Sequence, residues 1–395
     1  MLDVSAARAD TPGAEVVHHF NNAGAALPPK IVVDTVTDFL VGEATIGGYE
    51  AYAAAEPEIA AIYDSVATLI GVSRDHVALT TSATDSWLRA FQAIYFSGAL
   101  TAGSRALVSV AEYASNVLPL LQLARSGVVV DVIPDGPDGA LDVNAFRRML
   151  DDDVRLVAVT HAPSQNGLLN DVVGVGSVLQ QAGCDAWYIV DACQSVGQLP
   201  VDMLSMNADF LSGTGRKFLR GPRGTGFLGV SDRGLQLEPF PVDLHAATWV
   251  SLQGDKGPQY ELQAGARRYE TWEKSYASLL GLGAAIDYAL DIGIDNIRTH
   301  LAAVSTELRT QLAANPGVTV LDRGSDKSAI VTFTKTGEPS DVTVARIKAA
   351  GVNVGRGVVA YALRDYEQYR VEGMVRVAPH IFNNDADMDA LLAAI

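Results

Sequence analysis

Short apolar segments alternate with helical patterns between about residues 55 and 235. The apolar segments lack the alternation of polar and apolar residues that a sheet with one exposed face produces. Repeated strand and helix alternation is typical of right-handed βαβ units, which build a mostly parallel sheet covered on both faces. The pattern predicts strands at residues 76–81, 105–110, 128–134, 155–160, 187–192, 208–212 and 224–230.

The pattern changes after residue 278. Two long helical segments, 278–293 and 301–314, are followed by short strands at 318–322, 329–334 and 374–379 and a helix at 341–350. This order predicts a smaller α+β domain. We therefore expect an N-terminal segment (residues 1–50) that packs across the domain seam, a large α/β domain (51–278) and a small C-terminal domain (279–395).

Composition and charge restrict the function. The chain has 395 residues, 48% of them hydrophobic and 19% charged, with a net charge of -17. This acidity disfavours nucleic acids and anionic membranes, so a small-molecule partner is expected. No export signal begins the chain and no apolar run reaches the roughly 18 residues that a membrane span needs, which predicts a cytoplasmic protein. The two cysteines, Cys184 and Cys193, have no metal-ligand spacing, so we expect reduced thiols and no metal site.

Ligands of open parallel sheets bind beyond the carboxyl ends of the strands, so the loops after the strands are the places to examine. Residues 80–86 (TTSATDS) follow a predicted strand and lead into a helix. Hydroxyls, free backbone N–H groups and the helix dipole suit a phosphate there. Ordinary helix capping is the alternative interpretation.

Two further polar segments follow predicted strands. Asp191 opens DACQSVG (residues 191–197), where a buried carboxylate needs a cation such as a protonated pyridine nitrogen, unless it only caps a turn. Lys217 stands in TGRKFLRGPRGTG (residues 214–226), and Thr214 and Arg216 beside it can hold an anion. Taken alone, Lys217 also fits a solvated surface lysine.

These three segments, in this order, resemble the class V aminotransferase and cysteine desulfurase group of fold-type I pyridoxal-phosphate enzymes. The motifs D-A-x-Q-S-x-G and G-P-x-G-x-G carry the resemblance, which extends over nearly the whole chain. It implies a large, mostly parallel-sheet domain with the cofactor site, a small C-terminal α+β domain, and a homodimer whose sites are shared between subunits.

The resemblance also implies roles for individual residues. Lys217 forms the Schiff base with pyridoxal phosphate, Asp191 pairs with the pyridine nitrogen, and Gln194 binds the ring 3-hydroxyl. Ser164 stands where desulfurases usually carry an asparagine, and Asn166 is a possible substitute. The remaining implied cofactor residues are Ala83, Thr84, Thr214 and Arg216 at the phosphate, Tyr113 on the ring face, and Thr271 in a segment (268–273) that crosses from the partner subunit.

Substrate contacts follow from the same resemblance. Arg376, in MVRVAPH (residues 374–380), matches the arginine that binds the substrate carboxylate, for which a bidentate guanidinium is suited. Asn22 and Gly24 lie in NNAGAA (residues 21–26), which resembles the segment that lines the substrate pocket. Further candidates are His245, Trp249, Arg356 and Tyr361, although each of these residue types, taken alone, more often has a structural part.

The reaction expected is proton removal at Cα by Lys217, followed by β-elimination from an S-substituted cysteine. No cysteine follows Cys193, which disfavours a persulfide-forming desulfurase. Segments 43–50 and 216–224 look most like the ergothioneine-pathway carbon–sulfur lyase and the lincosamide-pathway enzymes, which points to secondary metabolism. Decarboxylative oxidative deamination, transamination and epimerisation stay open. A non-enzymatic regulator is disfavoured because such relatives typically lose the lysine or the aspartate.

Overall fold

Seven strands form the larger sheet of the structure, a computed structural model that describes residues 2–253 and 257–395. Strand β8 is antiparallel to both of its neighbours, and every other pairing in this sheet is parallel. The predicted mostly parallel sheet is therefore confirmed. The spatial order is β2 (Val77–Thr80), β8 (Gly226–Val230), β7 (Phe210–Thr214), β6 (Trp187–Asp191), β5 (Val154–Thr160), β3 (Arg105–Val108) and β4 (Val129–Val132).

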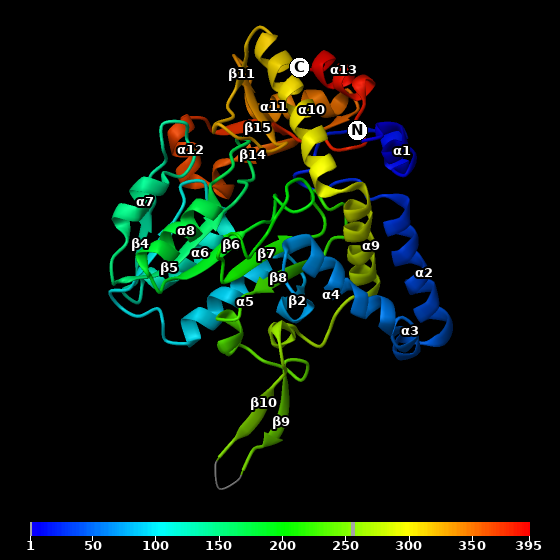
Figure 1. The fold of residues 1–395 in the computed structure, drawn as a ribbon. Helices are drawn as coiled ribbons and strands as arrows, with labels where there is room; N and C mark the ends of the chain where they lie inside the picture. Colours follow the sequence, from blue (N-terminus) through cyan, green and yellow to red (C-terminus); the bar gives the residue numbers. More distant parts are fainter. Residues whose placement is uncertain (1, 254–256) are drawn as a thin grey trace.

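Helices cover both faces of this sheet, which explains why its strands are apolar throughout (Figure 1). In β6, Trp187 and Ile189 belong to one hydrophobic core, whereas Tyr188 and Val190 belong to the other. Helices α5 (Ala83–Phe96) and α6 (Ala114–Ala124) pack on the first face. Those on the other face are α4 (Glu56–Ile70), α7 (Val143–Met149), α8 (Val172–Ala182) and α9 (Tyr276–Ile292).

A separate antiparallel sheet lies above the carboxyl edge of the large one (Figure 1). Its order is β11 (Val318–Val320), β12 (Val331–Lys335), β15 (Gly373–Val377) and β14 (Gly355–Val358). Helices α10 (Ile294–Ala314), α11 (Ser340–Ala349) and α13 (Asp385–Ala393) share its hydrophobic core. Helix α12 (Leu363–Tyr369), between β14 and β15, was not expected from the sequence pattern.

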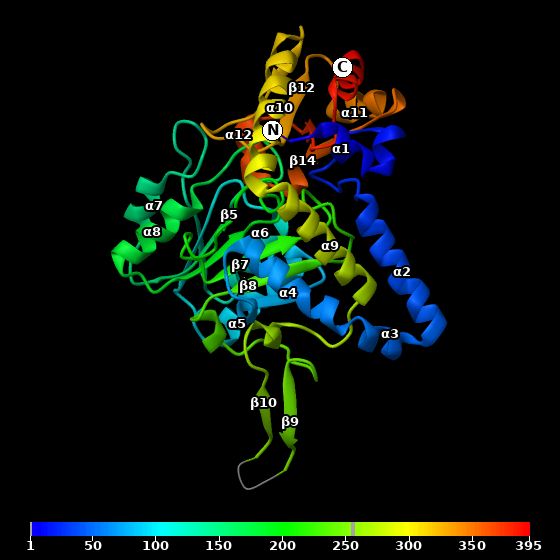
Figure 2. The same cartoon turned by 45° about the vertical axis from the view of Figure 1, so that its right-hand side comes forward.

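The N-terminal segment runs between the two sheets. Strand β1 (His18–His19) pairs with β13 (Val352–Asn353), and the Ala26 N–H donates to the Arg216 carbonyl at 3.0 Å. These bonds join the N-terminal segment to a two-stranded sheet with β13 and to the turn that follows β7. Helices α1 (Val4–Ala9), α2 (Lys30–Ile46) and α3 (Gly48–Ala54) complete this region, and α2 lies beside α9 in both views (Figures 1 and 2).

A hairpin that the sequence pattern did not predict projects from the far end of the molecule (Figure 2). It consists of β9 (Ala247–Ser251) and β10 (Gln259–Leu262), and it exposes 70% of Trp249. No single helix among the described residues is long and apolar enough to span a membrane, and only α9 and α10, bent by 78°, satisfy such a test as a pair.

Candidate active site

Asp191 ends β6 at the carboxyl edge of the large sheet and is buried. One carboxylate oxygen accepts hydrogen bonds from the Cys193 N–H at 2.8 Å and the Ser212 hydroxyl at 3.4 Å. The other accepts from the Asn116 side-chain amide at 2.9 Å. None of these donors carries a positive charge, so a cation brought by a ligand would be a suitable further partner for this buried carboxylate.

Lys217 follows β7, the strand next to β6, and is 8% exposed. Its Nζ donates to the Cys193 Sγ at 3.0 Å, which brings it beside the turn that follows Asp191. A Cβ on Gly197 would lie 2.5 Å from the backbone carbon of Phe218, and Gly197 has a φ of +87°. The last glycine of DACQSVG therefore lets the aspartate and lysine motifs pack backbone to backbone.

Helix α5 begins beside these motifs. Its N-cap Ser82 accepts from the Asp85 N–H at 3.1 Å, and the first N–H groups of the helix, those of Ala83 and Thr84, have no acceptor within the helix. A Cβ on Gly226 would lie 2.5 Å from the backbone carbon of Ser82, so this glycine lets the helix start approach the turn around Lys217. The helix N-terminus is suited to an anion.

The residues before Lys217 bind the protein backbone in the structure. The Thr214 hydroxyl donates to the Thr225 carbonyl at 3.1 Å, so its proton is used within the turn. Arg216 donates to the Gly24 carbonyl and thereby ties the turn to the N-terminal segment. Gln194 donates to the Ala23 carbonyl at 3.0 Å. Its buried Oε1 has no hydrogen-bond partner among the described residues.

Arg376 on β15 faces the same space. Its Nη1 donates to the Ser164 carbonyl at 2.8 Å, while its buried Nε has no partner among the described residues. Burial lowers the pKa of this guanidinium. A Cβ on Gly355, the residue paired with Arg376 in the sheet, would lie 3.2 Å from that Nε, so glycine leaves room there.

Arg356 was also expected at the substrate, and within this chain its side chain leaves the small sheet on the face opposite that of Arg376. It pairs with Val375, so strand alternation turns its side chain to the face opposite Arg376. There its Nε donates to the Ser340 hydroxyl at the start of α11, at 2.9 Å. Arg356 thus holds α11 against the small sheet.

Asn22 ties the N-terminal segment to β15 through a 2.7 Å hydrogen bond from its amide to the Ala378 carbonyl. Its Oδ1 is buried without a partner among the described residues, as is the Oδ1 of Asn21. Gly24, two residues later, contributes the carbonyl that Arg216 contacts. The predicted N-terminal segment therefore borders the space between Lys217 and Arg376.

Two tyrosine rings lie near each other beside this space. The Tyr113 and Tyr361 ring centroids lie 6.2 Å apart. Burial raises the pKa of the Tyr113 hydroxyl, and the charges of Arg216 and Arg376 oppose that shift. Tyr113 therefore lies within electrostatic reach of both arginines, and Tyr361 is 42% exposed.

Asn166 was expected to replace a ring contact, and its geometry argues against that part. Its amide donates to the Asp365 carboxylate at 2.7 Å, and its Oδ1 accepts from the Leu168 N–H at 3.2 Å. With a φ of +66°, Asn166 shapes the loop and fixes α12 to it. Ser164 contributes its backbone carbonyl to Arg376.

His245, Thr271 and Trp249 do not join this group within one chain. His245 contacts the buried Glu270 carboxylate at 3.1 Å, and Glu270 accepts from the Leu79 N–H at the free edge of β2. Strands β2, β8 and β7 separate this edge from Asp191 on β6. Thr271 adjoins Glu270, and Trp249 lies on the projecting hairpin. Within the described chain these three residues therefore lie apart from Asp191 and Lys217.

Asn116 and Glu112 were not expected in the site. Asn116, in the first turn of α6, donates to Asp191 and also to the fully buried Glu112 at 3.2 Å. Burial raises the pKa of Glu112 to about 7. The sequence shows only that Glu112 and Asn116 are four residues apart at the start of a helix. This spacing is common, and it does not indicate that Asn116 also contacts Asp191.

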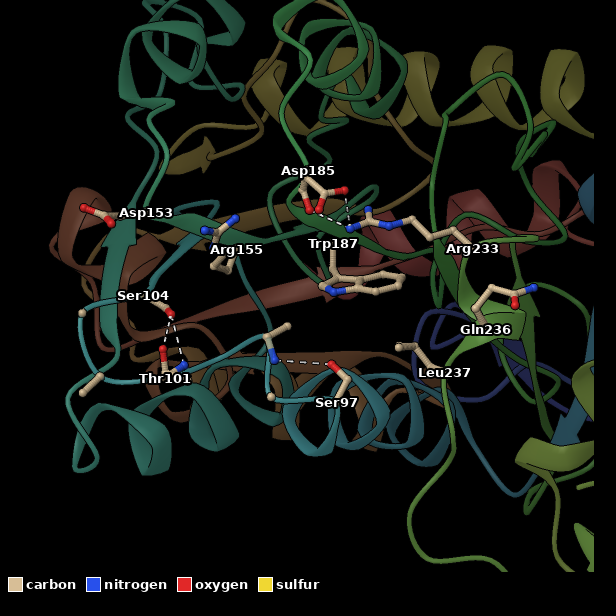
Figure 3. Close-up of a pocket in the computed structure, with 14 residues that line it drawn as sticks. Ser97, Thr101, Ser104, Asp153, Arg155, Asp185, Trp187, Arg233, Gln236 and Leu237 are labelled. Carbon is tan, nitrogen blue, oxygen red and sulfur yellow. Dashed lines mark hydrogen bonds and ion pairs between the residues drawn. The ribbon is translucent and has the colours of Figure 1, made fainter. Parts of the chain in front are cut away.

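A hollow of about 710 Å³ opens at the other end of the large sheet, at the amino ends of β3, β5 and β6 (Figure 3). Its Arg233 guanidinium stacks 3.7 Å from the Trp187 ring and pairs with Asp185 at 2.9 Å. This charge is already neutralised, and the hollow contains none of the residues predicted from the sequence.

The residues at the carboxyl edge fit pyridoxal phosphate. Among the described residues no cation pairs with Asp191 or Glu112, so a protonated ring nitrogen would supply the missing positive charge. Gln194 offers an unpartnered oxygen and Lys217 a buried amine. The N-terminus of α5 suits the phosphate. The site is thus typical of enzymes that use this cofactor.

Comparison with known proteins supports the assignment of pyridoxal phosphate to this site. The chain belongs to the aminotransferase class-V family, whose model matches residues 18–391. It is a pyridoxal-phosphate-dependent enzyme with the α/β fold of that family.

A probable cysteine desulfurase from Methanothermobacter thermautotrophicus is 28% identical over 381 residues, 95% of this chain and 93% of that protein. Cysteine desulfurase CsdA from Escherichia coli matches with a TM-score of 0.89 at 22% identity, covering 100% of this chain and 98% of that one. C-DES with glycine covalently linked to its cofactor matches at 0.84 and 20% identity, covering 98% of each chain. In another structure C-DES is described as a cystine C–S lyase in complex with its product, cysteine persulfide.

Proposed function

We propose that this enzyme cleaves the carbon–sulfur bond of an S-substituted L-cysteine by β-elimination, releasing a thiol or sulfenate with pyruvate and ammonia. The observation that best supports this proposal concerns the segment between β14 and β15. This segment places Tyr361 near Tyr113, and it contains no cysteine. A persulfide-forming desulfurase needs a nucleophilic thiol near the substrate sulfur. The names of the curated relatives support cysteine as the substrate class, and C-DES is a fold neighbour described as a C–S lyase.

The residues divide the work between binding and proton transfer. Pyridoxal phosphate, when bound, withdraws electrons from a bond at Cα. In this proposal Asp191 holds the ring nitrogen and the N-terminus of α5 the phosphate. Arg376 binds the substrate carboxylate through its free Nε, which orients the Cα–H bond. The Lys217 Nζ removes the α-proton, because it is the buried amine at this position.

A desulfurase is the second candidate, because the curated relatives carry that name. Only Cys193 places a thiol beside Lys217, and Cys184 lies before the amino end of β6. Burial raises the pKa of Cys193, which lowers its thiolate fraction and hence its nucleophilicity. Cys193 is therefore poorly suited to accept sulfur.

Product analysis tests the proposal. The enzyme with bound cofactor is incubated with an S-alkyl cysteine and, separately, with L-cysteine. We expect pyruvate, ammonia and free thiol in equal amounts from the S-alkyl cysteine, and we expect Cys193→Ala to retain this activity. Alanine with protein-bound sulfur from L-cysteine, lost in Cys193→Ala, would instead identify a desulfurase. An aldehyde with carbon dioxide would identify oxidative deamination, and a keto acid with aminated cofactor a transaminase. A change of configuration at Cα without bond loss would identify an epimerase.

Arg376→Lys is expected to raise KM for the amino-acid substrate about 10- to 100-fold with a smaller change in kcat, because lysine keeps the charge but loses the planar fork. Steady-state kinetics measure both constants. Arg356→Lys is the matched control, since Arg356 lies on the opposite face of the same strand pair, and its KM should equal that of the wild type. A larger KM effect at Arg356 than at Arg376 would contradict the assignment.

We also propose that the enzyme forms a homodimer. The projecting hairpin exposes Trp249, Leu252 and Tyr260, and an isolated two-stranded hairpin is at best marginally stable in water. A second copy that covers it would bring His245 and Thr271 towards a neighbouring site. We further propose a place in secondary metabolism near the ergothioneine- and lincosamide-pathway enzymes, which process S-conjugated cysteines.

A further inference from the structure

A chain of buried hydrogen bonds links Asp191 to a second carboxylate that the proposed reaction does not use. The Asn116 side-chain nitrogen donates to Asp191 Oδ2 at 2.9 Å and to Glu112 Oε2 at 3.2 Å. Asn116 is 3% exposed and Glu112 3%. The amide orientation is fixed, because only its NH₂ group can face two carboxylate oxygens.

Glu112 is itself anchored to the end of β5. Its Oε1 accepts from the Thr160 N–H at 2.6 Å and from the Ser109 hydroxyl at 2.7 Å, and its Oε2 accepts from the Thr160 hydroxyl at 2.7 Å. Strand β5 pairs with β6, and Thr160 lies opposite Asp191 in the register. Glu112 therefore fixes Asn116 relative to the strand that carries Asp191.

This arrangement restricts rotation of the Asp191 carboxylate. Its Oδ1 is held by the Cys193 N–H at 2.8 Å and its Oδ2 by Asn116, so the plane of the group is set by a donor at each oxygen. In the described part of the chain no cation pairs with either buried acid, and this raises the free energy of the fold. Burial, with the charge of Asp191 as a smaller cause, raises the pKa of Glu112. Such a cost is typical of functional sites.

We propose that Asn116 and Glu112 are positioning residues that orient the Asp191 carboxylate towards the ring nitrogen of pyridoxal phosphate. The inference rests on the proposed role of Asp191. Glu112 acts on Asp191 only through Asn116, so the two residues have one shared effect on the orientation of the Asp191 carboxylate. Neither residue needs to touch the substrate.

Cofactor binding by the apoenzyme tests the proposal without an activity assay. Asn116→Leu removes the donor at similar volume, and Glu112→Gln replaces one of the two acceptor oxygens of the Glu112 carboxyl group by an NH₂ group. Each variant should raise the dissociation constant of pyridoxal phosphate about tenfold or more, the effect of losing a hydrogen bond to a charged group. The pH midpoint of the bound cofactor's visible absorption should rise, because a ring nitrogen held less firmly repels the proton on the Lys217 nitrogen less.

The double variant separates positioning from general stability. Because Glu112 acts through Asn116, the double variant should bind the cofactor as weakly as Asn116→Leu alone. Asp209→Asn is the control: Asp209 is a buried carboxylate that accepts from the Tyr188 N–H at 2.9 Å near the other end of β6, so its loss should lower thermal stability and leave cofactor affinity unchanged.

Wild-type affinity and absorption midpoint in folded Asn116→Leu and Glu112→Gln, or additive effects in the double variant, would overturn the inference. If Asn116→Leu does not fold, Glu112→Gln alone decides through the same two measurements. Asp191→Asn is measured in parallel. A variant of Asp191 with normal cofactor affinity and absorption would instead reject the role of Asp191, on which the inference depends.

Discussion

Lys217→Ala is expected to lose covalent attachment of pyridoxal phosphate and to lower kcat by at least about a thousandfold, because one residue supplies both the cofactor link and the base for the α-proton. The buried Nζ, 3.0 Å from the Cys193 Sγ, is the amine at this position of the carboxyl edge. Absorption spectra of the purified variant and steady-state kinetics with an S-alkyl cysteine measure the two effects.

Lys335→Ala is the matched control, because Lys335 lies on β12 of the small sheet and donates to the carbonyl of the last residue, Ile395. It should keep the visible absorption band and the activity. A Lys217→Ala enzyme that retained both would contradict the assignment of the lysine.

Asp191→Asn is expected to lower kcat about 10²- to 10³-fold, the range for removing one preorganised electrostatic contact from an active site. The amide has nearly the same shape, but it cannot balance a positive ring nitrogen. The NH₂ group introduced by the substitution would also face a hydrogen-bond donor, either the backbone N–H of Cys193 or the side-chain amide of Asn116, and neither donor can accept its hydrogen bond. The variant should therefore fold and bind the cofactor weakly.

Kinetics at saturating cofactor measure this effect, and thermal unfolding of the apoenzyme verifies that the variant is folded. Ser212→Ala removes only the 3.4 Å hydrogen bond to Asp191 and serves as the mild comparison. Equal activity of Asp191→Asn and the wild type would show that charge at this position is not needed.

The strands of the large sheet were predictable because both of their faces are buried. A strand covered by helices on either side must be apolar throughout, and β6, with Trp187 to Val190 divided between two cores, is an example. The pairing of the aspartate and lysine segments was predicted from the family resemblance, and the structure gives its physical basis, because Gly197 packs against the backbone of Phe218.

The direction of Arg356 and the links of Asn116 were not predictable. Arg356 and Arg376 lie on neighbouring strands, and only the register of β14 with β15 puts their side chains on opposite faces. Asn116 meets Asp191 across 75 residues of sequence. Such a contact depends on how α6 packs on the sheet, which local patterns do not determine.

The hairpin β9–β10 was not predicted from the sequence, for another reason. Apolar residues of this hairpin, such as Trp249, are exposed, so its sequence lacks the alternation of buried apolar and exposed polar residues that indicates a strand. Glu270, beside Thr271, covers the Leu79 N–H at the free edge of β2. The family resemblance predicts that this segment reaches a second subunit, and the interactions within one chain do not reveal it.

Identification of the lysine that carries the cofactor tests the central claim most directly. The purified enzyme with bound pyridoxal phosphate is reduced with borohydride, digested, and analysed by peptide mass spectrometry. We expect a single modified peptide in which Lys217 carries the reduced cofactor. Modification of a different lysine, or no modified peptide from a folded, cofactor-loaded enzyme, would contradict it.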